Sequence, residues 1–262
     1  MTMAAHSVSR VEGADPIDVL RKVNLALALA HGLQAGLMIA LSNDLSLPVT
    51  ALFGTGPPGQ PLTPPQVEQL FSYRLGWGVA LFSALSALFH LLVASGWGFP
   101  RYRNELLAGR NRFRWVEYSI SASVMIVLIA GLTGLTDVVA LLGLFAINAA
   151  MILFGWLMET TNPLRPAGDW TPFVFGCIVG AVPWIGILIY LVGAGSDVPG
   201  FVYGIFVSLF VLFNCFAINQ VLQYRARGRW ARYLFGERVY LILSLVAKSL
   251  LAWQIFANVL VG

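Results

Sequence analysis

The last stretch of the chain, YLILSLVAKSLLAWQIFANVLVG (residues 240–262), is apolar except for one basic residue near its middle, Lys248. It is long enough to cross a bilayer as a helix, which takes about 20 mainly apolar residues. A lone charge at the centre of such a helix costs about 2.5–3.5 kcal/mol on insertion scales, and charges placed there usually serve a function. Lys248 therefore predicts a membrane bundle with an internal polar site and an acidic partner on another helix.

The composition of the whole chain also indicates a membrane protein. Hydrophobic residues make up 58% of the 262 residues and charged residues only 11%, whereas soluble domains carry about 25% charged residues. We therefore expect an all-α, multi-pass protein of a cell membrane, built as one bundle without a separate soluble domain. The net charge of +4 reflects the loops, so nucleic acid is not an expected partner, and residues 1–22 lack the apolar core of a signal peptide.

Seven segments have the length and apolarity of transmembrane helices. They cover residues 23–41, 75–95, 115–132, 138–157, 172–192, 201–223 and 239–261. Residues 1–22 then form a tail, and residues 23–262 form a single membrane domain. Glu117 is the only acidic residue inside these predicted spans, as Lys248 is the only basic one.

The basic residues of the connections predict the orientation. With seven spans, the N-terminal tail and every second connection face one side, which carries fourteen of the sixteen Lys and Arg residues. These are Arg10, Arg21, Lys22, Arg101, Arg103, Arg110, Arg112, Arg114, Arg165, Arg225, Arg227, Arg229, Arg232 and Arg238. The other side carries only Arg74. Because Lys and Arg mark the cytoplasmic side, we expect the N-terminus in the cytoplasm and the C-terminus outside, with the bilayer as an obligatory partner.

The longest connection on the outer side covers residues 42–74. It is rich in Gly and Pro, including the run GTGPPG at residues 54–59, which excludes a helix there. Two interpretations are open. One is an extended surface loop, which the sequence favours, and the other is a short hairpin used for dimer contacts.

Polar residues inside the spans gather at one depth. Counted at 1.5 Å per residue, Lys248, Glu117, His31 and His90 all fall in the cytoplasmic half of the membrane. Small polar residues stand three or four positions from them: Gln34, Ser86, Ser121 and Ser244. Because residues at these spacings share a helix face, the simplest packing directs them into one internal polar pocket.

Other interpretations of these residues are open. A histidine in a membrane helix is often a hydrogen-bonded packing residue, and Glu117 could pair with Arg114 at the membrane boundary. A metal site is not expected, because zinc takes about three protein ligands and the spans hold only two histidines. Aromatic residues crowd the last three spans around the buried amine, which favours a flat apolar ligand.

Several strings of the sequence resemble the heliorhodopsins, an inverted family of microbial-type retinal proteins. They are RWVEYS (114–119), SASVMI (121–126), NAAMILFGW (148–156), VPWIG (182–186) and LSLVAKS (243–249) followed by AWQ (252–254). The resemblance covers all seven spans. It implies a rhodopsin-like bundle with a cytoplasmic N-terminus, as the loop charges also predict.

The resemblance also implies a cofactor and the residues that hold it. Lys248 would carry all-trans retinal as a Schiff base, and Glu117 would be its counterion. Ser244, which stands where pumping rhodopsins carry an aspartate, would lie near the Schiff base. The retinal pocket would include Met125, Trp184, Phe213 and Gln220, and a polar cavity on the cytoplasmic side would include His31, Ser86 and His90. The resemblance also implies a homodimer, with strands of the first outer loop at the contact.

These features predict a light-absorbing photoreceptor rather than an enzyme. Proton pumps need groups on both sides of the Schiff base, whereas the outer half of these spans has no carboxylate or histidine. A single internal carboxylate favours a proton that leaves and returns on one side, as in a sensor acting on an unknown cytoplasmic signalling partner. The alternative is a light-driven or light-gated ion transporter.

Overall fold

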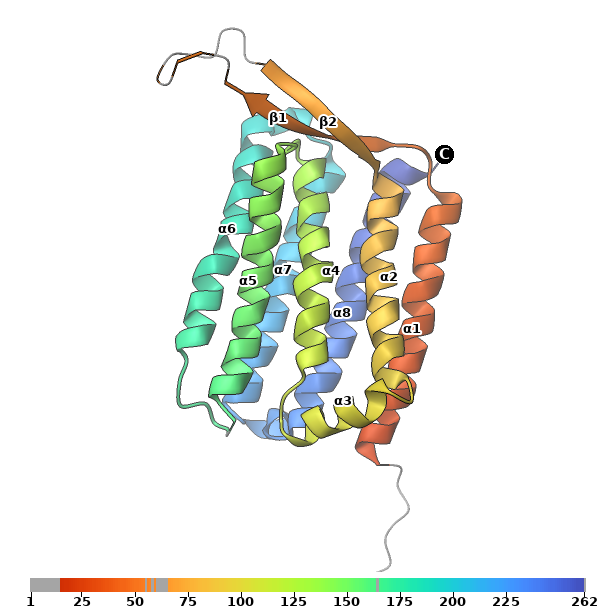
Figure 1. Cartoon of the computed structure of the whole chain (residues 1–262), viewed down its shortest axis with the longest axis vertical. Helices are drawn as coiled ribbons and strands as arrows, with labels where there is room; N and C mark the ends of the chain where they lie inside the picture. The colour runs from red at the N-terminus through yellow and green to blue at the C-terminus, as the bar shows by residue number, and fades with distance from the viewer. Residues whose placement is uncertain (1–14, 55, 58, 60–65, 164, 262) are drawn as a thin grey trace, which may run out of the picture.

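The computed structural model describes residues 15–54, 56, 57, 59, 66–163 and 165–261. Within this part of the chain, seven helices are long and apolar enough to cross a membrane. They stand side by side as one bundle (Figure 1). Their bounds are α1 Pro16–Leu41, α2 Leu75–Ala94, α4 Arg112–Leu132, α5 Val138–Thr161, α6 Thr171–Ala194, α7 Gly200–Tyr224 and α8 Tyr233–Ile255. The predicted seven-helix, multi-pass membrane architecture is confirmed.

A hairpin of two strands covers one end of the bundle. Strand β1 (Ser46–Phe53) pairs antiparallel with β2 (Gln66–Arg74), with a bulge after Val49. Thr50 fixes the hairpin to the α4–α5 turn, since its amide donates to the Thr136 carbonyl at 2.9 Å. The connection therefore forms the predicted hairpin, and the extended-loop interpretation is wrong; the dimer contact predicted for this hairpin stays a prediction. Residues 60–65, between the two strands in the sequence, lie outside the described residues, as do residues 1–14 with Arg10.

The opposite end carries a short helix that the sequence did not predict, α3 (Gly98–Leu107). It lies across the lower end of the bundle in Figure 1. Tyr102 and Leu106 are buried in one cluster with Ile17, Leu20 and Val93, so α3 packs against the start of α1 and the end of α2. We call this the α3 end of the bundle and the other the hairpin end.

Four helices extend by more than one residue further toward the α3 end than predicted. Helix α1 begins at Pro16 instead of residue 23, α4 begins at Arg112 instead of 115, α5 continues to Thr161 instead of 157, and α8 begins at Tyr233 instead of 239. The Asn111 side chain caps α4 by accepting a hydrogen bond from the Arg114 amide at 3.2 Å. The extensions of α4, α5 and α8 hold charged residues that pair with one another in the interior, so apolarity underestimated the lengths of these helices.

The half of the bundle nearer the hairpin is filled by apolar side chains. Met38, Phe82, Ile126, Leu209 and Leu251 belong to its main cluster and have no exposed surface. The C-terminal segment closes the same end, because the Asn43 amide donates to the Leu260 carbonyl at 3.0 Å. Buried ionisable groups are therefore confined to the other half and the middle of the described helices.

Candidate functional site

Lys248 of α8 and Glu117 of α4 form a buried ion pair in the middle of the bundle. The distance from Lys248 Nζ to Glu117 Oε1 is 2.6 Å, and the two residues are only 3% and 4% exposed. Removing one partner of such a pair costs about 3–5 kcal/mol, because the other charge stays buried. The acidic partner that Lys248 required is Glu117, and the alternative pairing of Glu117 with Arg114 is wrong.

Hydroxyl groups complete the surroundings of this pair. Ser86 of α2 donates a hydrogen bond to Glu117 Oε1 at 2.7 Å. Lys248 donates to the Ser244 hydroxyl, one helical turn earlier on α8, at 3.0 Å. The Tyr118 ring lies 5.1 Å from Lys248 Nζ, within the range of a cation–π interaction. Three helices thus hold one amine and one carboxylate in fixed positions.

The two intramembrane histidines lie together. The rings of His31 (α1) and His90 (α2) stack with centroids 5.7 Å apart. His90 Nδ1 is 2.7 Å from the Asn24 side-chain oxygen, whereas neither ring nitrogen of His31 has a hydrogen-bond partner in the described part of the chain. Gln34 bonds to Ser83 at 2.8 Å and does not join them.

An apolar cavity lies beside Lys248, which we call the lysine cavity. Its walls are mainly aromatic and aliphatic, and its few polar groups include the amine itself. The predicted pocket residues Met125, Phe213, Gln220 and Ser244 line it. Gly155 also lines it, and a Cβ at this position would collide with the Trp115 ring.

A second cavity between α5, α6 and α7 adjoins the first and is called here the α6 cavity. Phe213 and Gln220 line both cavities. Trp184, predicted in the same pocket as Lys248, lines only the α6 cavity. Its indole packs edge-on against Phe206, Phe210 and Phe213, with ring centroids 5.3–5.6 Å apart.

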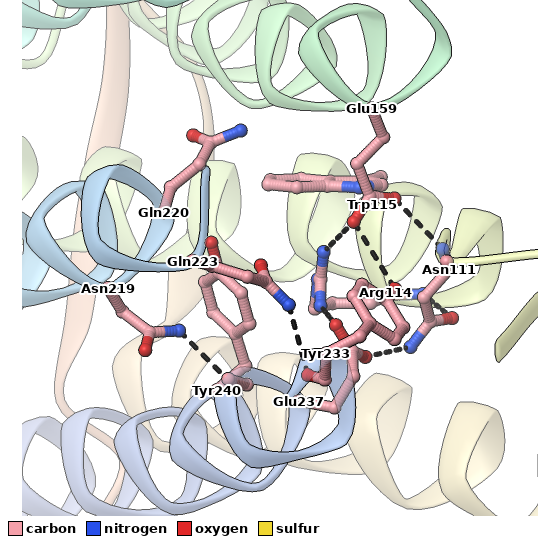
Figure 2. A network of polar contacts seen from close by, with 12 residues as sticks. Asn111, Arg114, Trp115, Glu159, Asn219, Gln220, Gln223, Tyr233, Glu237 and Tyr240 are labelled. Carbon is pink, nitrogen blue, oxygen red and sulfur yellow. Dashed lines mark hydrogen bonds and ion pairs between the residues drawn. The ribbon is translucent and has the colours of Figure 1, made fainter. Parts of the chain in front are cut away.

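A network of buried ions lies nearer the α3 end, at the start of α4 and α8 and the end of α5. Figure 2 shows its side chains from close by. Arg114 (α4) pairs with Glu159 (α5) at 2.7 Å and with Glu237 (α8) through its other terminal nitrogen. Trp115 Nε1 and the Asn111 amide donate to Glu159 at 2.7 and 2.9 Å. The Asn111 side-chain amide donates to Glu237 at 2.8 Å. One guanidinium thus joins three helices at this level.

A small third cavity, the polar cavity, reaches from Glu117 to this network. Its lining includes Glu117, His90, Arg114 and Glu237. Its volume of about 30 Å³ exceeds the roughly 10–15 Å³ that a cavity needs to hold one water molecule. Of the residues predicted for a polar cavity, His90 lines this one, whereas Ser86 and His31 do not.

Comparison with known proteins agrees with this geometry. The family profile described as Heliorhodopsin matches residues 20–260, almost the whole chain. The chain belongs to the heliorhodopsin family. The resemblance inferred from its sequence strings is thereby confirmed, and no curated protein matches the chain.

Solved structures of other rhodopsins share the heliorhodopsin fold seen here. A light-driven proton pump, LR (Mac) from Leptosphaeria maculans, is 13% identical with a TM-score of 0.61, over 94% of this chain and 95% of that one. The cyanorhodopsin (CyR) N4075R from the cyanobacterium Tolypothrix sp. NIES-4075 is 12% identical with a TM-score of 0.58, over 93% and 92%. At such identities the likeness concerns the fold alone.

Sequence reasoning missed the ion network of this heliorhodopsin. It assigned Arg114 to a solvated loop and placed Glu159 and Glu237 outside the spans, so Glu117 was wrongly taken as the only carboxylate inside the helices. In the described structure, Glu159 and Glu237 are 2% and 1% exposed. The sequence did contain a signal for this network. Each of the three charged residues lies within two residues of the end of a predicted span.

Proposed function

We propose that this heliorhodopsin is a light-absorbing photoreceptor that binds all-trans retinal covalently through Lys248. The observation that carries the proposal is the buried Lys248–Glu117 pair beside an aromatic-walled cavity. A desolvated lysine amine is a nucleophile that condenses with an aldehyde to a Schiff base. Bound there, retinal would supply absorption of visible light and a change of shape on isomerisation.

The lining of the lysine cavity supports a long, flat, apolar ligand. Small-molecule sites are walled mainly by apolar and aromatic side chains with a few placed polar groups. Met125, Phe213 and Phe216 supply the apolar walls, and Gln220 and Ser244 are among the few polar groups. We assign Trp184 to the neighbouring wall of the α6 cavity, where Phe213 connects the two spaces.

We assign Glu117 as the counterion of the positive charge on the Lys248 nitrogen. Its carboxylate lies 2.6 Å from Nζ and accepts a hydrogen bond from Ser86. A carboxylate at this distance favours the protonated nitrogen. Ser244 and Ser86 orient the pair. His90 lines the polar cavity together with Glu117 and stacks on His31, so it can share the proton of the pair.

The distribution of ionisable groups supports a sensory role rather than ion pumping. Between the level of Lys248 and His31 and the hairpin end, the described membrane helices contain no further Asp, Glu, His, Lys or Arg. A proton leaving Glu117 can therefore reach other carboxylates only toward the α3 end. We infer that it leaves and returns on that side.

The positions of basic residues support an inverted orientation in a cell membrane. Arg101, Arg103 and the basic loop after α7 belong to the α3 end, and Lys and Arg mark the cytoplasmic side. The N-terminus then lies in the cytoplasm and the C-terminus outside. The cytoplasmic loops provide the surface on which an unidentified signalling partner would sense the light-driven change.

We also propose that the hairpin forms the contact of a homodimer. Strand β2 is exposed along almost its whole length, and Val67 and Phe71 are 63% and 55% exposed. Exposed apolar strands commonly pair with a second chain.

Adding all-trans retinal to the expressed protein tests the proposal. We expect a visible absorption band that is absent from Lys248→Ala. Illuminated cells should show no lasting change of external pH. A pH change abolished by a protonophore would favour the alternative, a light-driven or light-gated ion transporter, and a band in Lys248→Ala would contradict retinal attachment there.

A further inference from the structure

We propose that Glu237 is a second proton-exchanging group, which takes up the proton displaced from the Lys248–Glu117 pair and later returns it. The inference rests on the proposed photoreceptor function, although the properties of Glu237 itself do not depend on a bound cofactor. It assigns a function to the ion network at the α3 end, beyond holding three helices together.

The charges of the network do not balance. Arg114, Glu159 and Glu237 are 6%, 2% and 1% exposed, so one buried cation faces two buried carboxylates. An unbalanced buried charge is costly, and protonation of one carboxyl group removes the imbalance. The cluster therefore has the capacity to hold one proton.

Hydrogen bonding indicates which carboxyl group accepts it. Glu159 already receives four donors, from Arg114, Trp115, Tyr233 and the Asn111 backbone. Glu237 receives only two, from Arg114 and the Asn111 side chain. A carboxylate offers about four acceptor positions, so Glu237 retains free ones, whereas protonating Glu159 would displace a donor.

The polar cavity connects Glu237 with the counterion. Glu237 and Glu117 both line this cavity, and Glu159 does not. His90 lines it as well, and its Nε2 is buried without a hydrogen-bond partner among the described residues. A water molecule fits the cavity and would bridge these groups, which gives the proton a route between them.

Other ionisable groups around Glu237 do not replace Arg114 as its partner. Arg165 lies beyond Tyr233, with its guanidinium 4.7 Å from that ring, and makes no ion pair in the described part of the chain. From α8, Tyr240 stacks under Arg114, whose guanidinium is 3.9 Å from its ring. From α3, Tyr102 lines the polar cavity, and burial raises the pKa of its phenol, which therefore stays uncharged.

The proposed step is a proton transfer without redox change. An N–H bond of the charged Lys248 nitrogen breaks, and the nitrogen keeps the electron pair. The released proton passes Glu117, crosses the polar cavity and forms an O–H bond at a free acceptor position of Glu237. The carboxylate becomes a neutral carboxyl group, and Arg114 remains paired with Glu159. Breaking that O–H bond returns the proton along the same cavity.

Infrared titration of the retinal-free protein provides the first test. We expect the carbonyl stretch of a buried protonated carboxyl group to appear as the pH falls and to be missing in Glu237→Gln. In Glu159→Gln the band should still appear, but only at lower pH. Arg114 then pairs with Glu237 alone and favours its charged carboxylate. Glu105→Gln is the matched control, since Glu105 is also buried and bound to arginines but does not line the polar cavity. A band unchanged in Glu237→Gln would overturn the proposal.

Flash measurements on the retinal-loaded variants provide the second test. Positioned acid–base groups contribute about 100-fold or more to proton transfer, so we expect Glu237→Gln to slow reprotonation about 100-fold and Glu105→Gln to leave it unchanged. Equal rates in the two variants would overturn the proposal. If the unchanged protein binds no retinal, the photoreceptor function fails, while the infrared titration still decides the role of Glu237.

Discussion

Replacing Glu117 with Gln removes the negative charge 2.6 Å from Lys248 Nζ while keeping the shape of the side chain. Breaking a buried pair by removing one partner costs about 3–5 kcal/mol. A change of about 1.4 kcal/mol moves the titration of one proton by one pH unit. The pH at which the Lys248 nitrogen loses its proton should therefore fall by roughly 2–3.5. The carboxylate stabilises the charged nitrogen, so its loss lets the proton leave earlier as the pH rises.

The assay is a titration of the visible band toward alkaline pH in the retinal-loaded protein. We expect the midpoint of Glu117→Gln to fall by about 2–3.5 pH units on the same energetic grounds. The matched control is Glu159→Gln, which removes a buried carboxylate from Arg114 rather than from Lys248 and should leave the midpoint in place. A midpoint that does not move in Glu117→Gln, or that moves equally in both variants, would refute the counterion assignment.

Three further changes test other parts of the structure. Gly155→Ala should reduce retinal uptake, because the added Cβ collides with the indole that walls the lysine cavity and overpacking costs about 1–3 kcal/mol; uptake equal to that of the unchanged protein would contradict the cavity assignment. Arg114→Gln should destabilise the protein by about 3–5 kcal/mol in thermal unfolding, because two carboxylates lose their buried partner, whereas the exposed Arg112→Gln should cost about 0–1 kcal/mol. Phe71→Ser should shift the protein from dimer to monomer in size-exclusion chromatography. Leu107→Ser, at a still more exposed apolar position of the α3 end (67% against 55%), should not.

Much of the fold could be predicted from the sequence because long apolar segments identify membrane helices. All seven spans correspond to helices, and the energetic argument about Lys248 led to Glu117. The errors in the predicted helix ends at the ion network have a common cause. Helix ends at Arg114, Glu159 and Glu237 were placed by apolarity, which cannot distinguish a charge in solvent from one neutralised inside the bundle.

The remaining differences depend on tertiary contacts. Helix α3 is short and held by the burial of Tyr102 and Leu106, which local sequence does not reveal. The strands of the hairpin are separated by a segment rich in Gly and Pro, so their pairing across residues 46–74 was only one of two possibilities. Trp184 lines the α6 cavity rather than the lysine cavity, because its position depends on how α6 meets α7.

The central claim is that Lys248 carries retinal, and chemical trapping tests it most directly. The retinal-loaded protein is treated with borohydride under illumination, which fixes an imine linkage as a stable amine, and is then digested and analysed by mass spectrometry. We predict a retinyl group on the peptide that contains Lys248 and on no peptide containing Lys22, the other lysine of the chain. Retinyl label on Lys22, or no label in a protein that shows the visible band, would contradict the claim.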